Sequence, residues 1–498
     1  MKNIKKLRNI FISASIGICT FCSCTSILDQ EPIEYPTGKT FWQTSTDAST
    51  ALSGCYAELR SILLNGDGGM AYFTYGDFPT KIFDYGEWDQ NSFAGNYQWY
   101  SDSDMADWSK FYKTINSTNL VLEKVAAMSI DKFGTDPALA QQQKNKILGE
   151  AYFLRAYTYF YMARIWGQFP LVLKAISSAD QAVNDVPYGT NTQVLDQCIS
   201  DLTQAAKLLS WGYTDSNEKA VRANKGAVYS LFAHLYLWKA RPNQKTIDPN
   251  WITKAEAACD SVITHGNYQL VDAADYSKIF KGKSDEGIFE INFDVATNEA
   301  LSQYGFTTYF LAKPILPEYR ETPIFHFNPE FLNLFNDEKD LRRTAFFYNF
   351  GEGDQCMCAK YSSITFKSAD KKSWVTDDNL IIFRLADIYL LRAEALTRMG
   401  KYGDARIWLN KVRNRAGLDD FAGTDDGLYY EILKERRREL FLEGQNLYDC
   451  VRTGYYAYLP DYSQQRYDGE GYYWPVNSSL FVRNKYVQQT PYWSTRLQ

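Results

Sequence analysis

The chain has 498 residues, 45% of them hydrophobic and 22% charged, with 53 Lys and Arg against 59 Asp and Glu. This composition supports a large folded core and excludes disordered and collagen-like proteins. The 3 histidines are few beside 37 tyrosines and 12 tryptophans. We therefore expect aromatic stacking surfaces, and neither a metal site nor a cofactor.

The N-terminus is typical of a secretory signal. Four cations between Lys2 and Arg8 precede an apolar run over residues 10–21, which is too short to span a bilayer. The run ends in a segment that resembles a bacterial lipobox, with small Ser23 directly before Cys24. We interpret residues 1–23 as a signal peptide and predict that Cys24 is lipidated after cleavage.

Residues 24–40 are predicted to be a lipidated tether. They contain two prolines and few large apolar residues, which suits an extended linker that lifts the body off a membrane. Once the four signal cations are removed, the net charge of −6 becomes about −10. Such a charge repels phosphate backbones and argues against nucleic acid as a partner.

Helices are predicted over most of the remaining chain. Apolar residues recur at helical spacing in residues 153–163, 194–209, 228–237 and 255–262. The first of these segments is apolar nearly all round, so we expect a central helix there.

A helical hairpin is predicted between residues 384 and 415. One apolar stripe ends before Gly400 and a second begins at Tyr402, with Ala393 and Ala405 at the positions where the two helices would cross. This spacing is that of a tetratricopeptide repeat. The predicted fold is mainly α, with degenerate tetratricopeptide-like hairpins interrupted by aromatic-rich loops and short strands.

The insertions between helices hold many of the aromatic residues. Residues 72–112 contain 14 Phe, Trp or Tyr without helical periodicity, and residues 455–493 contain 12. Residues 282–350 combine several prolines with an alternating run over residues 288–293, which predicts loops with a few short strands.

An aromatic loop with amides and carboxylates is suited to sugars, because a pyranose stacks its C–H face on a ring while its hydroxyls bind planar polar groups. The predicted glycan ligands from the first insertion are Tyr75, Asp77, Tyr85, Trp88, Asp89, Asn91, Asn96, Trp99 and Tyr100. Further candidates from later insertions are Tyr304, Tyr309 and Trp374.

Glu443 and Asp449 raise the alternative of a glycoside hydrolase with paired carboxylates. On one continuous helix they would point 240° apart. We favour an ion-pair network, with Arg436 beside Glu439 and Glu443 flanking it, that holds this helix against its neighbours. The six cysteines after residue 24 are predicted to be buried or free thiols.

Several segments together resemble the SusD/RagB family of Bacteroidetes outer-membrane nutrient-binding lipoproteins. The matching segments are residues 24–32, 41–56, 149–156, 166–171, 384–396, 409–417, 435–444 and 474–476. The sequence departs from the family pattern at Gln445, Asn446 and Thr453, and at its Thr490-Pro491-Tyr492 ending.

The resemblance implies a non-catalytic glycan-binding lipoprotein on the outer face of the outer membrane, anchored through Cys24. It also implies a SusC-like TonB-dependent transporter as partner, and one SusD-like domain over residues 41–498, with parts at about 41–270 and 271–498. No binding residue carries over, because the family's sites lie in variable insertions. A surface glycoside hydrolase, or an adhesin or scaffold without a small ligand, remains the alternative.

Overall fold

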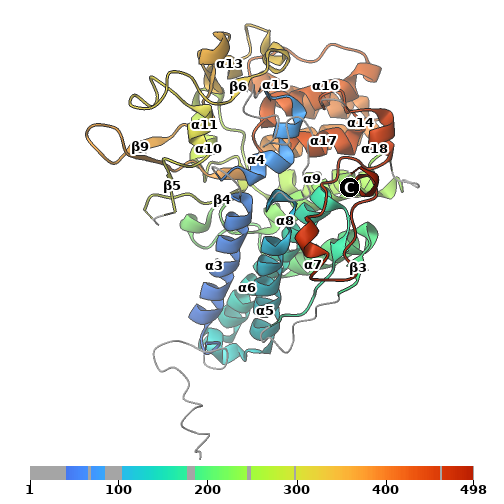
Figure 1. Cartoon of the computed structure of the whole chain (residues 1–498). Helices are drawn as coiled ribbons and strands as arrows, with labels where there is room; N and C mark the ends of the chain where they lie inside the picture. The colour runs from blue at the N-terminus through green and yellow to red at the C-terminus, as the bar shows by residue number, and fades with distance from the viewer. Residues whose placement is uncertain are drawn as a thin grey trace, which may run out of the picture.

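The structure is a computed structural model that describes residues 41–65, 69–84, 104–176, 186–243, 248–296, 299–459 and 462–496. Helices dominate these residues, which confirms the predicted mainly α fold (Figure 1). The longer helices are α3 (Ser45–Leu63), α5 (Ser109–Ala127), α6 (Pro137–Trp166), α7 (Asn191–Leu208), α8 (Lys225–Lys239), α9 (Asn250–His265), α14 (Leu385–Arg398), α15 (Tyr402–Arg415), α16 (Asp425–Leu440) and α17 (Asn446–Thr453). The shorter ones are α4 (Ala71–Gly76), α10 (Tyr276–Lys281), α11 (Thr307–Phe310), α12 (Pro329–Leu332), α13 (Arg342–Ala345) and α18 (Gln464–Asp468).

Helix α6 is the central helix that the apolar pattern predicted. It begins where the Asp136 carboxylate accepts hydrogen bonds from the amides of Ala138 and Leu139, with Pro137 in the first turn. Every residue from Phe153 to Trp166 is buried, because α6 packs against α3, α5 and α7.

Consecutive helices pack as hairpins, in agreement with the predicted repeats. Helix α6 packs on α7, α8 on α9, and α14 on α15, while α9 also packs on α14 and so joins two of the pairs. In the last hairpin, Gly400 has a φ of 74° and ends the first helix, while Ala393 and Ala405 are fully buried at the crossing. Small residues there let the two helices approach closely.

Short antiparallel strands connect the helices. The pairs are β1 (Phe83–Asp84) with β6 (His326–Phe327), β2 (Phe169–Pro170) with β3 (Tyr188–Gly189), β4 (Gly287–Ile291) with β11 (Leu380–Arg384), and β7 (Phe347–Tyr348) with β8 (Met357–Cys358). The remaining strands form a three-stranded sheet in the order β5 (Leu301–Ser302), β10 (Trp374–Thr376), β9 (Ile364–Phe366).

The strand expected from alternation at residues 288–293 exists as β4, but both of its faces are buried. Helix α8 packs against β4, and even Glu290 is only 1% exposed. The alternation of apolar and polar residues therefore predicted the strand correctly, but it did not predict that both faces of the strand are buried.

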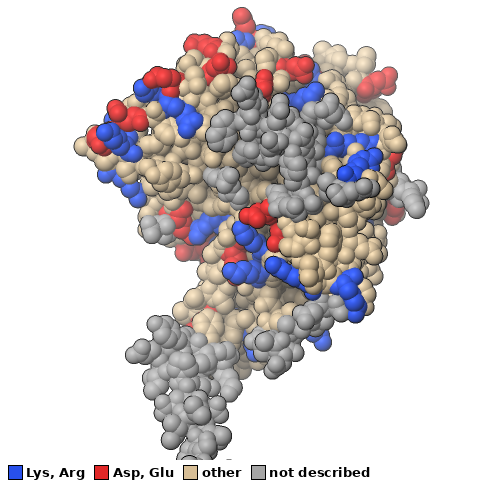
Figure 2. All heavy atoms as spheres, in the orientation of Figure 1, with Lys and Arg blue, Asp and Glu red and all other residues tan. Residues whose placement is uncertain are grey.

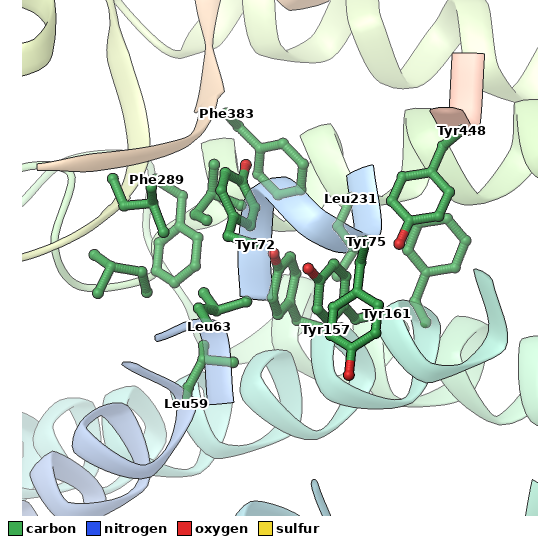
Figure 3. Close-up of a cluster of buried hydrophobic side chains, with 14 of the residues drawn as sticks. Leu59, Leu63, Tyr72, Tyr75, Tyr157, Tyr161, Leu231, Phe289, Phe383 and Tyr448 are labelled. Atoms are coloured by element: carbon green, nitrogen blue, oxygen red, sulfur yellow. The ribbon is translucent and has the colours of Figure 1, made fainter. Parts of the chain in front are cut away.

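The main hydrophobic core contains residues from Ala48 to Trp493 and so includes both ends of the described chain. Figure 3 shows part of it, where Tyr72 and Tyr75 of α4 lie beside Tyr157 and Tyr161 of α6. At one point two backbones touch: a Cβ atom on Gly76 would lie 2.4 Å from the carbonyl oxygen of Gly444. Only glycine allows this approach.

The six cysteines of the described chain are free thiols and all are buried, as predicted. Burial raises the pKa of the Cys358 and Cys450 thiols to about 12, which keeps both in the neutral form.

Candidate functional site

A cleft opens beside the β1–β6 strand pair, and we call it the β1–β6 cleft. In the pair, Phe83 lies opposite Phe327 and Asp84 lies opposite His326. The cleft has a volume of about 480 Å³, which is in the range of small-molecule sites. It is lined by Asp84, His326, Phe327, Pro329, Leu332, Asn333, Asn336, Phe350, Gly351, Gly353 and Asp354.

Phenylalanine rings behind the strand pair hold the wall of the cleft in place. The Phe83 ring lies 4.8 Å from the Phe327 ring and 5.5 Å from the Phe310 ring, centroid to centroid. Phe327 in turn meets Phe347 edge to face at 5.0 Å. The backbone amide of Asn328 donates to the carbonyl of Ile82 at 2.9 Å. Side chains that project from this wall are therefore held by a packed scaffold.

Polar groups of the cleft come from strand β6 and from the 3-10 turns at Asn333–Phe335 and Gly353–Gln355. The His326 Nδ1 atom lies 3.2 Å from Asp354 Oδ1, and its Nε2 atom lies 3.1 Å from the carbonyl oxygen of Pro323. Asn333 and Asn336 are exposed, and their amides can both donate and accept hydrogen bonds. The arrangement suits a ligand rich in hydroxyl groups.

One aromatic ring completes the lining. The Phe350 ring is half-buried, and the guanidinium of Arg343 lies 4.8 Å from its centroid. Phe335 and Phe347 hold the ring at its edges, at 6.3 and 5.3 Å. Such a ring can pack against the apolar face of a sugar.

Most of the predicted glycan ligands lie outside the described residues. Asp84 of the cleft is the residue directly before the segment 85–103, to which these ligands belong. They are Tyr85, Trp88, Asp89, Asn91, Asn96, Trp99 and Tyr100. The lipidation site Cys24 and the segments 1–23 and 24–40 also lie outside the described residues.

Tyr75 and Asp77 are interior residues, which corrects their assignment as ligands. Tyr75, which Figure 3 shows among the buried side chains, is 1% exposed. Its hydroxyl donates to the carbonyl of Met105 at 2.7 Å. Asp77 is fully buried and accepts hydrogen bonds from the backbone amide of Gly444 and the side-chain amide of Asn446, each at 2.6 Å. Helix α4 and the residue that caps its C-terminus turn both side chains into the core, so neither is available to a ligand.

The later candidates divide in the same way. Tyr304 follows β5 and is 77% exposed, so its ring is available for stacking. Tyr309 is half-buried with its ring 5.3 Å from that of Phe325. Trp374 is 4% exposed and meets Tyr319 edge to face at 5.5 Å. Trp374 therefore packs a small cluster and is corrected to a structural residue.

Sequence reasoning missed the side chains of the cleft itself. Asp84, Asn333, Phe350 and Asp354 come from three separate segments, and no motif joins them. The one available signal was the density of Pro and Gly between residues 314 and 353, which marks a region of loops.

A buried ion-pair cluster accounts for the charged residues that suggested a hydrolase. We define it as Asp340, Arg342, Lys360, Arg384, Arg415, Glu286, Glu435, Glu439 and Glu443. Arg384 pairs with Glu286, Glu439 and Glu443 at 2.6 to 2.8 Å, while Lys360 lies 2.8 Å from Glu443. Burial alone would raise the pKa of Glu435, but the guanidinium groups of Arg342 and Arg438 lower it to about 2.

The predicted network is present, but its pairing was wrong. Arg436 binds Asp387 and Asp449, each at 2.8 Å, because it faces α14 and α17. Helix α16 ends at Leu440, so the helical geometry assumed for Glu443 does not apply. Glu443 and Asp449 are both buried between cations. They are held as structural carboxylates and do not flank an open site.

Two smaller cavities of about 290 Å³ each include Arg222 in their lining. Two of the cations that line them are paired inside the protein, since Arg222 lies 2.9 Å from Glu150 and Lys146 lies 2.5 Å from Glu218. Within the described part of the chain, no three His, Cys, Asp or Glu side chains are grouped to hold a metal ion. No helix in this part is long and apolar enough to cross a membrane.

Two protein-family models match this chain. The family described as "Starch-binding associating with outer membrane" matches residues 65–237, and the family described as "SusD family" matches residues 348–493. The first match extends from α4 into α8 and the second includes α14 to α18.

Related proteins carry the same family name. The chain is 27% identical to SusD-like protein P38 of Formosa agariphila, over 90% of this chain and 92% of that protein. It is 35% identical to the starch-binding protein SusD of Bacteroides thetaiotaomicron, over 23% of this chain and 21% of that protein.

Solved structures share the fold. A SusD homolog from Bacteroides thetaiotaomicron superposes with a TM-score of 0.76 at 24% identity, covering 91% of this chain and 99% of that one. NanU of Bacteroides fragilis gives a TM-score of 0.72 at 24% identity, covering 93% and 99%. These structures show that the fold is shared. The two family matches and the relative matched over 92% of its length agree, and the chain belongs to the SusD/RagB family.

Proposed function

We propose that this protein is a cell-surface glycan-binding lipoprotein that captures an oligosaccharide and delivers it to a SusC-like TonB-dependent transporter. The β1–β6 cleft is the observation that carries the proposal. It combines exposed amides and a carboxylate with an aromatic ring on a rigid wall. In the sequence, Asp84 of this cleft is followed directly by residues 85–103, which include Trp88 and Trp99.

The proposal includes no catalysis. A retaining or inverting glycosidase needs two carboxyl groups that face one open site. Glu443 and Asp449, the pair that the sequence suggested, are each bound by two cations in the interior. The family's description as starch-binding supports capture.

The anchor and the partner are part of the same proposal. Lipidation of Cys24 would hold the protein at the outer membrane, with residues 24–40 as the tether and the remainder facing outward. Delivery requires a partner that crosses the membrane, and the family's described association with the outer membrane supports a transporter in that role.

Affinity gel electrophoresis of the purified protein through a panel of polysaccharides tests glycan capture. Retardation by at least one polysaccharide, without release of reducing sugar, supports the proposal. Retardation by none, both for the protein alone and for the protein purified with its membrane partners, contradicts it. Release of sugar by the purified protein would instead favour the hydrolase.

A further inference from the structure

A second groove lies between α7 and α9 along α8, and we call it the α8 groove. The three helices pack side by side (Figure 1). The groove has a volume of about 450 Å³ and is lined by residues of these helices, chiefly Lys207 of α7, Tyr229, Phe232 and Tyr236 of α8, and Lys254 of α9. Stacked helical hairpins present binding surfaces of this kind to other chains.

A row of aromatic rings forms the floor of the α8 groove. The Phe232 and Tyr236 rings stack with centroids 5.3 Å apart, and Trp251 continues the stack beyond Tyr236 at 5.6 Å. Trp211 covers the Tyr229 ring in the same way, at 5.3 Å. Because these rings cover one another's faces, the groove presents mainly their edges. Such a floor is not a platform on which the apolar face of a sugar can stack.

Four hydrogen-bond donors line the groove without an acceptor of their own. Lys207 and Lys254 are exposed, and neither pairs with an Asp or Glu of the described chain. The hydroxyls of Tyr229 and Tyr236 likewise bond to no other residue that the structure describes. Burial raises the pKa of Tyr236 to about 12, so its hydroxyl stays protonated and can donate. None of the described residues that line the groove is an aspartate or a glutamate.

The acidic residues of the three helices are bound by other cations. The helices contain four such residues. At 2.6 to 2.9 Å, Asp196 is bound by Lys239, Asp201 by Arg155, and both Glu256 and Asp260 by Arg392. No carboxylate on α7, α8 or α9 is therefore left to compensate the two lysines of the groove.

A protein segment that carries carboxylates fits this combination of groups. A carboxylate can accept charge-assisted hydrogen bonds from a lysine ammonium and from a tyrosine hydroxyl. Apolar side chains of the same segment can pack on the ring edges and on Ala206 and Ala257, which also line the groove. A polyanionic polysaccharide would supply the charge, but it would find no open ring face on which to stack.

We infer that the α8 groove binds an acidic segment of a partner protein. This inference goes beyond glycan capture and does not depend on it, because the α8 groove shares no lining residue with the β1–β6 cleft. Complementary charge of this kind favours the right partner and speeds association with it.

The test uses short fluorescent peptides that share one pattern of leucines and carry glutamate, glutamine or lysine at the remaining positions. Fluorescence anisotropy measures the binding of each peptide to the purified protein. We expect the glutamate peptide to bind about tenfold tighter than the glutamine peptide, or better, since each charge-assisted hydrogen bond is worth about that factor. The lysine peptide should not bind, and added salt should weaken the binding of the glutamate peptide.

Substitutions in the groove connect this binding to the site. Lys207→Glu combined with Lys254→Glu should weaken the glutamate peptide about tenfold or more, because two attractive charges become repulsive. Tyr229→Phe combined with Tyr236→Phe keeps the stacked rings and removes only the two hydroxyl donors, so it should weaken the same peptide by a smaller factor. Equal melting temperatures check that both variants are folded.

The matched control reverses two lysines far from the groove. Lys371 and Lys372 are exposed in the turn between β9 and β10. Figure 2 shows Lys and Arg beside Asp and Glu at the left edge of the molecule, where β9 lies in Figure 1. Lys371→Glu combined with Lys372→Glu makes the same change in net charge and should leave the affinity for the glutamate peptide unchanged.

The outcomes separate this inference from the proposed function. Absence of binding by the glutamate peptide, or equal binding of the glutamate and glutamine peptides, overturns the inference. Equal losses in the groove variant and the control variant overturn it too, because they would reveal attraction to the surface in general. Binding of alginate or chondroitin sulfate in place of the glutamate peptide, lost in the groove variant, overturns the class of partner. Glycan capture is measured separately by affinity gels, in which the groove variant should match the wild type.

Discussion

Asp77 is an interior carboxylic acid that joins the two ends of the core. Its oxygens accept hydrogen bonds from Gly444 and Asn446, which lie more than 360 residues further along the chain. Burial raises the pKa of Asp77 to about 7, although these hydrogen bonds oppose the shift. The folded protein therefore holds this proton more tightly than the unfolded chain, whose Asp residues titrate near pH ~3.9.

This shift predicts a pH dependence of folding. The contribution of Asp77 to the free energy of unfolding is largest below about pH 4, declines as the pH rises to about 7, and is constant above that. Between pH 4 and 7 this decline in the free energy of unfolding is on the order of 3 to 4 kcal/mol, and Asp77→Asn should remove it. Urea unfolding of both proteins from pH 4 to 8 measures the difference. The control substitution Asp420→Asn, at an exposed position, should give the same pH profile of unfolding free energy as the wild type. An Asp77→Asn profile that superimposes on the wild-type profile would contradict the raised pKa of Asp77.

Single aromatic side chains should decide glycan affinity. Trp88→Ala, Trp99→Ala and Tyr304→Ala should each weaken binding of the retained polysaccharide by about 1 to 3 kcal/mol without changing the melting temperature, if each ring stacks on the sugar. Tyr75→Ala should instead lower the stability by about 3 to 5 kcal/mol, because this ring is buried. Affinity gels and thermal unfolding distinguish the two effects.

Sequence reasoning separated these aromatic residues poorly. Tyr75 and Tyr304 both lie in sequence segments that are rich in loop-forming and polar residues, yet Tyr75 is buried in α4 whereas Tyr304 is exposed in the turn after β5. Asp84 and Asp354 escaped notice because the cleft between them depends on the pairing of β1 with β6. Composition predicts which residue types bind a sugar, but long-range pairing decides which of them meet.

At the scale of elements, the buried ion-pair cluster fixes α16 to the strand and helix around it. Arg342 is fully buried and pairs with Asp340, Glu435 and Glu439. Arg342→Met should lower the free energy of unfolding by about 3 to 5 kcal/mol, because it leaves buried carboxylates without their partner. Denaturant titration measures this loss.

The matched control for that substitution is Lys339→Met. Lys339 pairs with Asp419 at 2.6 Å, but both side chains are exposed, and exposed pairs contribute little. Lys339→Met should therefore leave the denaturation midpoint within error of the wild type. If Arg342→Met and Lys339→Met changed the stability equally, burial would not determine how much an ion pair contributes to it.

The turn of the α14–α15 hairpin offers a second matched pair of substitutions. Gly400 has a φ of 74°, and a Cβ there would meet no atom within 4 Å, so Gly400→Ala should destabilise by about 1 to 2 kcal/mol through backbone strain alone. Gly403 lies inside α15 in equally open space. Gly403→Ala should stabilise by up to about 1 kcal/mol, and thermal unfolding of both variants checks the opposite signs.

Helical elements were predictable because their signals are local. The apolar stripe of α14, which includes Ala393, ends close to Gly400, the residue that terminates the helix. These two neighbouring signals were enough to predict the hairpin. β4 was predictable as a strand but not as one buried on both faces, because its covering comes from α8 and β11. The partners of Arg436 were missed for the same reason, since they lie on other helices.

For the whole molecule, the proposed anchor makes one direct prediction. Cys24→Ala should move the protein from the membrane fraction to the soluble fraction and abolish incorporation of labelled palmitate, because the lipid-bearing thiol is absent. Cys22→Ala is the control and should leave the protein in the membrane fraction. Membrane retention of a Cys24→Ala protein that still incorporates palmitate would contradict the lipobox assignment.

The contact between Gly76 and Gly444 also constrains when the protein can fold. Helix α4 reaches its final position only against a turn near the C-terminus, and the Tyr72 hydroxyl next to it lies 2.5 Å from the carbonyl of Glu443. A chain that emerges N-terminus first therefore cannot close its core until nearly nine-tenths of it has been synthesised. The export that we propose for this chain would use this delay, since a chain with an open core can be threaded across a membrane before it folds on the far side.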